Sequence, residues 1–340
     1  MAKAVKLADI AERVGVSTVT VSKALSGQKG VSEEMRDKIK RLADELGYKQ
    51  PSAVMRDKKI RQSHNIGVLI EEGYLDKYES FYWQMYQHVS TCALGYECFT
   101  LMEVISRRME EQLEVPKVIK EQKVHGVIVI GRMSAGFLKM LRENSGVPLV
   151  YMDFTDEEQG TDSVVSDSYY GAYHLTNYLL SQGHTKIGYV GTLLATSSIT
   201  DRYLGYVKAL LEHGIEPRQD WRLDDRDMAS GLIEDELLQL PVEMPTAFFC
   251  NCDLTAGRMI QKLRASGYRV PEDISVAGFD NYIYPGICDV GITTYEVDQT
   301  AMAKQAVKIL VKRMEKESCR YGTHIVEGRL VVKESVETIR

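Results

Sequence analysis

The sequence predicts a small all-helical head followed by a larger α/β body with two doubly wound parallel-sheet lobes. The chain has 340 residues, which is too long for one ordinary core. Residues 1–60 hold 13 Lys and Arg against 8 Asp and Glu, whereas the remainder holds 29 against 40. A basic head on an acidic body indicates that only the head meets a polyanion. Beyond residue 65, short apolar runs alternate with helical patterns, which is typical of parallel sheets covered by helices.

In the head, apolar residues recur at helical spacing as far as Gly15, which is placed to end the first helix. Ser17 is a good N-cap for a helix over 18–25, and Ser32 for a third helix. Two short helices joined by a tight glycine turn, with a third bracing them, predict a helix-turn-helix that places its second helix in the DNA major groove. An ordinary three-helix bundle remains the alternative at this point.

The outward and flanking positions of the second helix carry small polar side chains and methyl groups. Serine and threonine reach phosphates or base edges, and the methyl groups of valine and threonine contact thymine. The predicted DNA-reading residues are Thr18, Val19, Thr20, Ser22 and Lys23.

The body extends over about 275 residues, which is too much for one doubly wound sheet, so we expect two lobes. Ligands of such folds bind at the carboxyl ends of the strands, here in a cleft between the lobes. The expected strands are 66–70, 97–102, 126–130, 147–152, 186–190, 246–250 and 274–278, and the expected helices include 80–94, 168–182, 201–213, 253–266 and 299–316.

The stretches VKLADIAERVGVSTVTVSKALSG and VSEEMRDKIKRLADELGY closely resemble the LacI/GalR family of bacterial transcription regulators. HGVIVIG, VPLVYMD, GHTKIGYVGT, VPEDISVAGFDN and ITTY continue the family's order through the body, so the resemblance covers essentially the whole chain. It implies a periplasmic-binding-protein-like body that binds an effector and dimerises. The implied ranges are a head at 1–50, a hinge helix or linker at 51–61 and a body at 62–340, with lobe one at about 62–161 plus 294–322 and lobe two at about 162–293 plus 323–340.

By the same resemblance, Thr18 and Val19 read bases. Lys23 stands where the family often has an arginine, and lysine cannot make the same bidentate contact to guanine. PSAVMR resembles the hinge helix, which wedges a leucine into the minor groove. Lys58 occupies the usual leucine position, and Met55 is the nearest apolar substitute. The predicted hinge contacts are Ala53, Met55, Arg56 and Lys58, and a flexible basic tether is the alternative.

Residues suited to sugar recognition lie at the expected strand ends and helix starts. Carboxylates and arginines bridge neighbouring hydroxyls, and an aromatic face covers the C–H side of the ring. The candidates are Phe81, Tyr82, Asp153, Arg202, Asp253 and Asp280. The resemblance implies effector contacts for Phe81, Tyr82, Asp153, Arg202 and Asp280. Helix capping is the better interpretation of Asp167 and an open alternative for Asp253.

Three departures from the family pattern limit the prediction of the ligand. Cys252 replaces a usual asparagine, and Arg226 replaces a cleft aromatic and would suit a carboxylate or phosphate. Thr196 stands at the arginine of purine-type members, which argues against a nucleobase corepressor. The pattern therefore favours a sugar or an acidic sugar derivative.

No nucleophile elbow, phosphate-binding glycine loop or metal-ligand spacing occurs, so we expect no enzyme, cofactor or metal. Six dispersed cysteines and a charged N-terminus without a secretion signal indicate a reducing cytoplasm. No apolar run is long enough to span a membrane.

We therefore expect a cytoplasmic homodimeric repressor that binds a near-palindromic operator in double-stranded DNA under control of a small effector. The alternatives are a solute-binding receptor without regulatory function, a sugar-modifying α/β enzyme, and a regulator with a non-sugar effector or a protein corepressor.

Overall fold

The computed structural model divides into two compact units, Met1–Gln62 and Ser63–Arg340, which we call the head and the body. Each is considered by itself. The hinge candidates Ala53, Met55, Arg56 and Lys58 lie outside the described residues, so their DNA contacts stay predictions. The described residues are 5–25, 30–46, 48, 64–75, 80–158, 160–228, 231–282, 286–317 and 320–339.

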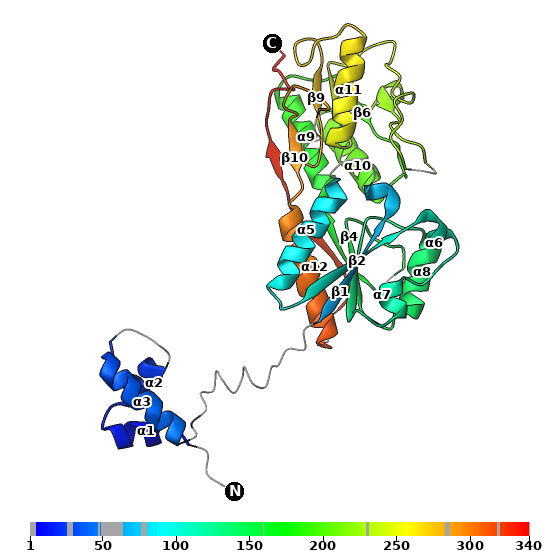
Figure 1. Ribbon diagram of the computed structural model, residues 1–340. Coiled ribbons are helices and arrows are strands. Elements are labelled where there is room, and N and C mark those ends of the chain that lie inside the picture. Colours follow the sequence, from blue (N-terminus) through cyan, green and yellow to red (C-terminus); the bar gives the residue numbers. More distant parts are fainter. Residues whose placement is uncertain are drawn as a thin grey trace. The chain divides into compact units, whose positions relative to one another are not determined.

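The head contains the three predicted helices, α1 (Leu7–Val14), α2 (Thr18–Leu25) and α3 (Glu33–Glu45) (Figure 1). Gly15 ends α1 in the left-handed conformation, with φ 78°, and its N–H donates to the Ala11 carbonyl. The Ser17 hydroxyl accepts the Thr20 N–H at 3.1 Å and so caps α2. All three helices contribute to one apolar core, which contains Ile10, Ala11, Val21, Ala24, Ile39 and Ala43.

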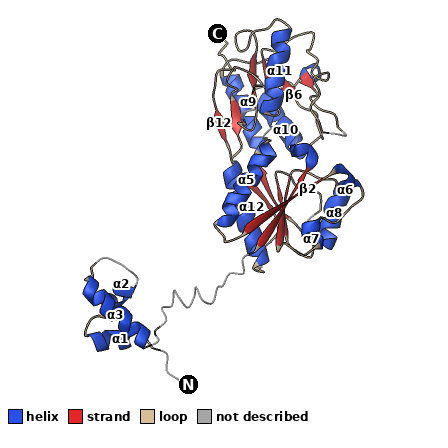
Figure 2. Cartoon of the chain, in the orientation of Figure 1, coloured by secondary structure: helices blue, strands red, loops and turns tan. Residues whose placement is uncertain are grey.

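Lobe one of the body is built on a six-stranded parallel sheet in the order β11-β5-β4-β3-β1-β2. Helices cover both faces of this sheet (Figure 2). Alternate residues of β1 serve the two faces: Ile66 and Val68 pack in the cluster with α5 and α12, and Leu69 packs in the cluster with α8. The bounds are β1 (Asn65–Glu71), η1 (Glu72–Leu75), α5 (Phe81–Leu94), β2 (Phe99–Ile105), α6 (Arg107–Glu111), α7 (Lys117–Lys120), β3 (Gly126–Ile130), α8 (Ala135–Asn144), β4 (Leu149–Met152), β5 (Asp162–Ser166), α12 (Gln299–Met314) and β11 (Thr323–Val326).

Lobe two is built on a four-stranded parallel sheet in the order β7-β6-β8-β9. Helices α9 and α10 pack on one face, and α11 packs on the other. A Cβ on Gly205 would lie 2.1 Å from the Tyr169 carbonyl oxygen, so the close crossing of α9 and α10 requires glycine there. The bounds are α9 (Ser168–Ser181), β6 (Ile187–Val190), α10 (Ser197–Glu212), η2 (Gln219–Trp221), β7 (Arg222–Leu223), β8 (Ala247–Cys250), α11 (Asp253–Ala265) and β9 (Ser275–Ala277).

The chain crosses between the lobes slightly later than the sequence pattern suggested. Strands β5 and β11 belong to the first sheet, so lobe one runs to about Ser166 and resumes as far as Val326, instead of ending near 161 and 322. A two-stranded antiparallel ribbon of β10 (Thr294–Glu296) and β12 (Arg329–Val331) accompanies the crossings. One hydrophobic cluster contains residues of both lobes.

Each of the seven expected strands is present within a few residues, as are the five expected helices. The short strands β5, β7, β10, β11 and β12 were not expected. Strand β11 has the sequence THIV at a sheet edge and exposes every second residue, so its apolar signal is weak. Within the described residues, the helices are too short or too polar to cross a membrane.

A buried ion pair joins β5 to the end of α12. The Arg313 Nε lies 2.8 Å from Asp162 Oδ2, and both side chains are almost fully buried. The Gly322 N–H donates to the same carboxylate at 3.1 Å. The Arg313→Ala substitution strands a buried carboxylate, so we expect it to lower the free energy of unfolding by about 3–5 kcal/mol. Urea unfolding followed by the fluorescence of Trp83 and Trp221 measures this, and Lys312→Ala, at the exposed neighbouring position, is the control. Equal midpoints for the two variants would contradict the role given to the pair.

Candidate functional site

The outward face of α2 presents the residues predicted to read DNA. Thr18, Val19, Ser22 and Lys23 are exposed, and Val19 shows 61% of its surface despite being apolar. Thr20 is half-buried, and its hydroxyl lies 2.9 Å from that of Ser17 at the start of the helix. Small side chains at this end leave the backbone free to approach a DNA groove closely.

Helix α3 fixes the other end of α2. The Arg36 guanidinium donates to the carbonyls of Lys23 and Ala24 at 3.4 and 3.1 Å. These are carbonyls of the last helical turn, which have no partner within the helix. The arginine therefore holds α2 as one rigid unit with its exposed face intact.

In the body, two of the predicted carboxylates follow strands of different lobes. Asp153 follows β4 of lobe one and Asp280 follows β9 of lobe two, with φ angles of 71° and 103°. Left-handed backbone at non-glycine residues is uncommon and concentrates at functional sites. Backbone hydrogen bonds of 2.8 Å, from Asp153 N–H to Val164 and from Asp280 N–H to Tyr295, hold both conformations.

The side chain of Arg202, on α10, makes most of its polar contacts at the junction between the lobes. It is 5% exposed, and its Nη2 lies 3.1 Å from Asp280 Oδ1. Its Nη1 donates to the Asn251 carbonyl at 2.5 Å, and its guanidinium lies 3.8 Å from the centre of the Phe279 ring. Its Nε has no hydrogen-bond partner among the described residues, which leaves one donor for a ligand.

Lobe one contributes an aromatic pair beside its carboxylate. The Tyr82 hydroxyl donates to Asp153 Oδ2 at 3.0 Å, and the Tyr74 ring lies 4.4 Å from the Tyr82 ring. A Cβ on Gly131 would approach Tyr74 within 2.6 Å, so glycine leaves space for this ring. We call Tyr74, Tyr82, Asp153, Arg202, Arg226 and Asp280 the interlobe cluster.

Electrostatics connect the two halves of the interlobe cluster. Burial raises the pKa of Asp153 to about 6, opposed by the charge of Arg202 and the hydrogen bond from Tyr82. Burial raises the pKa of Asp280 to about 7, Arg202 opposes the shift, and the negative charge of Asp153 adds to it. Two carboxylates from opposite lobes therefore compete for one guanidinium.

Arg226, the other predicted basic residue, is bound within its own lobe. Its Nε and Nη2 donate to the two oxygens of Asp225 at 3.1 and 2.8 Å. Nη2 also donates to the Asn251 side-chain oxygen at 2.9 Å. It still faces lobe one, since its charge lowers the otherwise raised pKa of Tyr74.

Two further candidates, Phe81 and Asp253, are buried and make contacts within the protein. Phe81 is buried, with its ring 6.1 Å from that of Tyr282 in the other lobe. Asp253 is 3% exposed and accepts the Tyr282 N–H at 2.9 Å, so it does not cap α11. Burial, followed by the charge of Asp280, raises the pKa of Asp253 well above its usual range.

Asp167, Thr196 and Cys252, which the sequence analysis singled out, each make a local contact. Asp167 accepts the Tyr170 N–H at 3.1 Å, which confirms its role as the cap of α9. Thr196 accepts the Ile199 N–H at 3.2 Å and caps α10. The Cys252 sulfur lies 3.2 Å from the Thr255 hydroxyl, at the position where the family pattern usually has an asparagine.

Sequence reasoning missed Tyr74, Asp225 and Asn251. Tyr74 lies in the short helix η1 after β1, where no periodicity marks it. Asn251 directly follows β8, so its place at a strand end was a usable signal. Asp225 is one of three aspartates in the run DDRD, and the sequence does not indicate which of them is buried.

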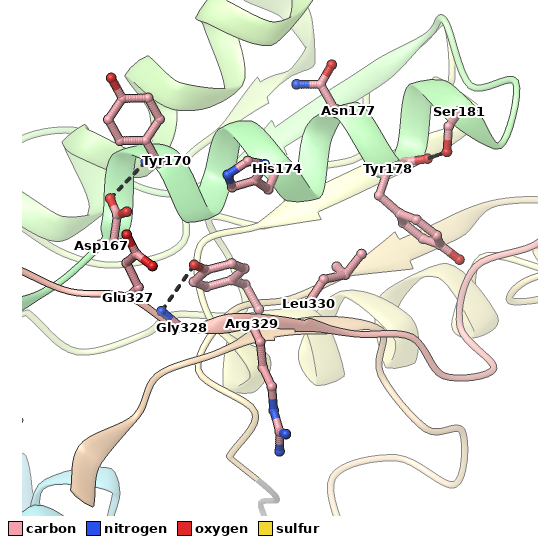
Figure 3. Close-up of a pocket in the computed structure, with 11 residues that line it drawn as sticks. Asp167, Tyr170, His174, Asn177, Tyr178, Ser181, Glu327, Gly328, Arg329 and Leu330 are labelled. Atoms are coloured by element: carbon pink, nitrogen blue, oxygen red, sulfur yellow. Dashed lines mark hydrogen bonds between the residues drawn. The ribbon is translucent and has the colours of Figure 1, made fainter. Parts of the chain in front are cut away.

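A separate open groove of about 760 Å³ runs between α9 and the β10–β12 ribbon (Figure 3). Its lining shares no residue with the interlobe cluster. Asp167 is engaged as a cap, the Tyr295 hydroxyl accepts the Gly328 N–H at 3.1 Å, and Arg329 pairs with Glu296. The interlobe cluster is therefore the stronger candidate site, since its buried Arg202 Nε has no partner within the described part of the chain.

The raised pKa values of Asp153 and Asp280 predict a pH-dependent stability. Both bind a proton more tightly in the folded chain, so their contribution is complete below pH about 4 and is lost as pH rises through 6 to 7. The Asp153→Asn substitution keeps an acceptor for Tyr82 but removes the charge beside Asp280. We expect its Tm to exceed that of the wild type at pH 8 and the difference to shrink at pH 5. The control is Glu121→Gln at an exposed position; a loss in Asp153→Asn that is equal at both pH values would contradict the electrostatic account.

Comparisons with known proteins agree with this architecture. Residues 6–51 match the family profile described as bacterial regulatory proteins, lacI family, and residues 176–336 match that of a periplasmic binding protein-like domain. The HTH-type transcriptional repressor PurR of Aliivibrio salmonicida (strain LFI1238) is 29% identical over 335 residues, covering 97% of this chain and 98% of the relative. PurR of Vibrio campbellii (strain ATCC BAA-1116) is 27% identical over 340 residues, with the same coverage.

Solved structures share the fold. A complex of the transcriptional regulator CelR with cellobiose has a TM-score of 0.67 at 24% identity, covering 97% of this chain and 99% of the other. The Lac repressor dimer bound to operator and the anti-inducer ONPF has a TM-score of 0.65 at 22% identity, covering 98% and 100%. The two profiles together match more than half of the sequence, and the curated relatives are repressors and not enzymes. The chain belongs to the lacI family of bacterial regulatory proteins.

Proposed function

We propose that the chain is a cytoplasmic, homodimeric transcriptional repressor whose operator affinity is set by a sugar bound at the interlobe cluster. The exposed recognition face of α2 is the single observation that carries the DNA-binding part. Each subunit presents one such face to a half-site, so a dimer reads a near-palindromic operator. Thr18, Val19, Thr20, Ser22 and Lys23 are the residues proposed to make these contacts, together with the hinge residues already named.

Exposed apolar residues on the body support the dimer. Strand β2 is an edge of the first sheet and exposes Phe99, Leu101 and Val104. Leu94, at the end of α5, is 59% exposed. An apolar edge strand open to solvent invites pairing unless a partner covers it. A second copy of the chain is the partner we propose.

The interlobe cluster supports an effector that joins the lobes. Its carboxylates and aromatic rings come from both sides of the junction, and hydroxyl groups both donate to carboxylates and accept from the Arg202 Nε. A sugar held between Asp153 and Asp280 has different contacts in the open and closed arrangements of the lobes. Such differential contacts are what shifts a conformational equilibrium, with a coupling of about 1–3 kcal/mol.

The alternatives differ in what they predict for DNA and ligand. A solute receptor without regulatory function has no use for the exposed face of α2. A nucleobase effector or a protein corepressor leaves DNA binding in place but removes the response to sugars.

For the head, we expect the Val19→Glu substitution to reduce the affinity for duplex DNA at least tenfold. Val19 is exposed, so the fold tolerates the change, but the new carboxylate faces the phosphates. Val242→Glu, at a fully exposed valine of the body, is the matched control. Affinity is measured by fluorescence anisotropy over a salt series, on duplexes selected from a random library. DNA binding is assigned to the wrong surface if the two variants bind equally well.

For the body, a sugar at 100 times its dissociation constant should stabilise the protein by about 2.7 kcal/mol, a visible thermal shift. We expect Arg202→Lys and Asp280→Asn to abolish the shift while DNA binding persists. Lysine keeps the charge but cannot contact Asp280 and the Asn251 carbonyl with one planar fork. Arg269→Ala, an exposed arginine of the same lobe, is the control. A sugar-induced shift that survives both cluster substitutions would place the effector elsewhere.

A further inference from the structure

An acidic effector would depend on Arg226, but Arg226 already forms an ion pair with Asp225. The two nitrogens that face Asp225 form a bidentate pair of 3.1 and 2.8 Å. Nη2 is shared further with the Asn251 side-chain oxygen at 2.9 Å and lies 3.8 Å from the Cys252 sulfur. These contacts use Nε and Nη2, so the N–H groups of Nη1 remain, and what the pair with Asp225 chiefly offsets is the positive charge.

Asp225 is itself held firmly as an anion. It is fully buried and accepts the Thr192 N–H at 3.0 Å, the Asn251 amide at 2.7 Å and the Thr255 hydroxyl at 2.7 Å. Burial alone would raise its pKa, but Arg226 and these donors bring the pKa down to about 2. Its charge therefore offsets much of the charge of Arg226 throughout the neutral range.

The remaining charges of the interlobe cluster favour acceptors of hydroxyl groups. Arg202 is the only other guanidinium in the cluster, and it contacts Asp280, the Asn251 carbonyl and the Phe279 ring. Asp153 and Asp280 face the junction, and burial followed by the charge of Asp280 raises the pKa of the neighbouring Asp253. An incoming carboxylate or phosphate meets these carboxylates beside two guanidinium groups that are each already paired with an aspartate.

We propose that Asp225 is a specificity-determining residue: by clamping Arg226 it makes the interlobe cluster select an uncharged polyhydroxyl effector and reject its carboxylate or phosphate derivative. This inference rests on the proposed sugar response of the same site. An acidic sugar derivative is expected only if Arg226 is available to the ligand. The ion pair of Arg226 with Asp225 argues against this availability.

The first test compares matched ligands on the full chain. Glucose is titrated calorimetrically beside glucuronate and glucose 6-phosphate, and galactose beside galacturonate, at constant ionic strength. We expect the neutral member of a pair to bind at least tenfold more tightly than its anionic counterpart. Tighter binding of an anionic member, lost in Arg226→Gln, overturns the proposal. This comparison needs no variant that perturbs Asp225.

The second test uses inorganic phosphate as the probe, so it does not depend on the identity of the effector. Phosphate and chloride are compared at equal ionic strength by thermal shift. We expect Asp225→Asn to gain a phosphate-specific stabilisation that disappears in Asp225→Asn/Arg226→Gln, because the amide releases Arg226. Arg222→Gln, whose arginine pairs with Asp224 at a half-exposed position, is the control. A phosphate-specific stabilisation of the wild type that Arg226→Gln removes overturns the proposal.

The two proposals fail in different ways. If a neutral ligand binds selectively but does not change the affinity for duplex DNA, the repressor function fails and the specificity proposal stands. If an anionic ligand binds through Arg226 and changes DNA affinity, the repressor function stands and the role of Asp225 fails.

Discussion

The lobe junction depends on one constraint: a buried charge must find a partner. The carboxyl ends of two parallel sheets meet there and bring Asp153 and Asp280 near one guanidinium, that of Arg202. Burial raises the pKa of both carboxyls, and one guanidinium only partly opposes the shift, so the junction is sensitive to a ligand that supplies hydrogen-bond donors. Nearby, two hydrogen bonds pair Arg226 with Asp225, so each of these buried charges has a partner and the charge of Arg226 is largely offset. The contrast between these two pairs defines what the site can hold.

The head and the body differ in charge and in how their packing fixes the functional residues. The head places a small-residue face of α2 on a core of its own and fixes the end of that helix with Arg36. The body has an apolar cluster shared by both lobes, so packed side chains connect the two lobes at the junction. Two of its crossing segments contain β10 and β12, which pair with each other as an antiparallel ribbon.

Most of the fold could be predicted from the sequence, because deeply buried elements have strong apolar patterns. The central strands, such as GVIVI at 126–130, are buried throughout and read as apolar runs. Edge strands such as β11 are half-exposed and escaped notice. Among the site residues, Asp153 and Asp280 were predictable as polar residues at strand ends. The ion pair between Asp225 and Arg226 could not be predicted from the sequence. It depends on which aspartate of DDRD is buried against Asn251, and no local sequence pattern indicates this tertiary contact.

The central claim is that ligand binding at the lobe junction and DNA binding at the head are coupled. Linkage makes this coupling reciprocal, so it can be measured from either side. The most direct measurement is the dissociation constant of a neutral sugar, identified by thermal shift, for the free chain and for the chain saturated with selected duplex DNA. The account predicts that the two constants differ, by the same factor by which the sugar changes the affinity for DNA. Identical sugar constants with and without DNA would contradict it.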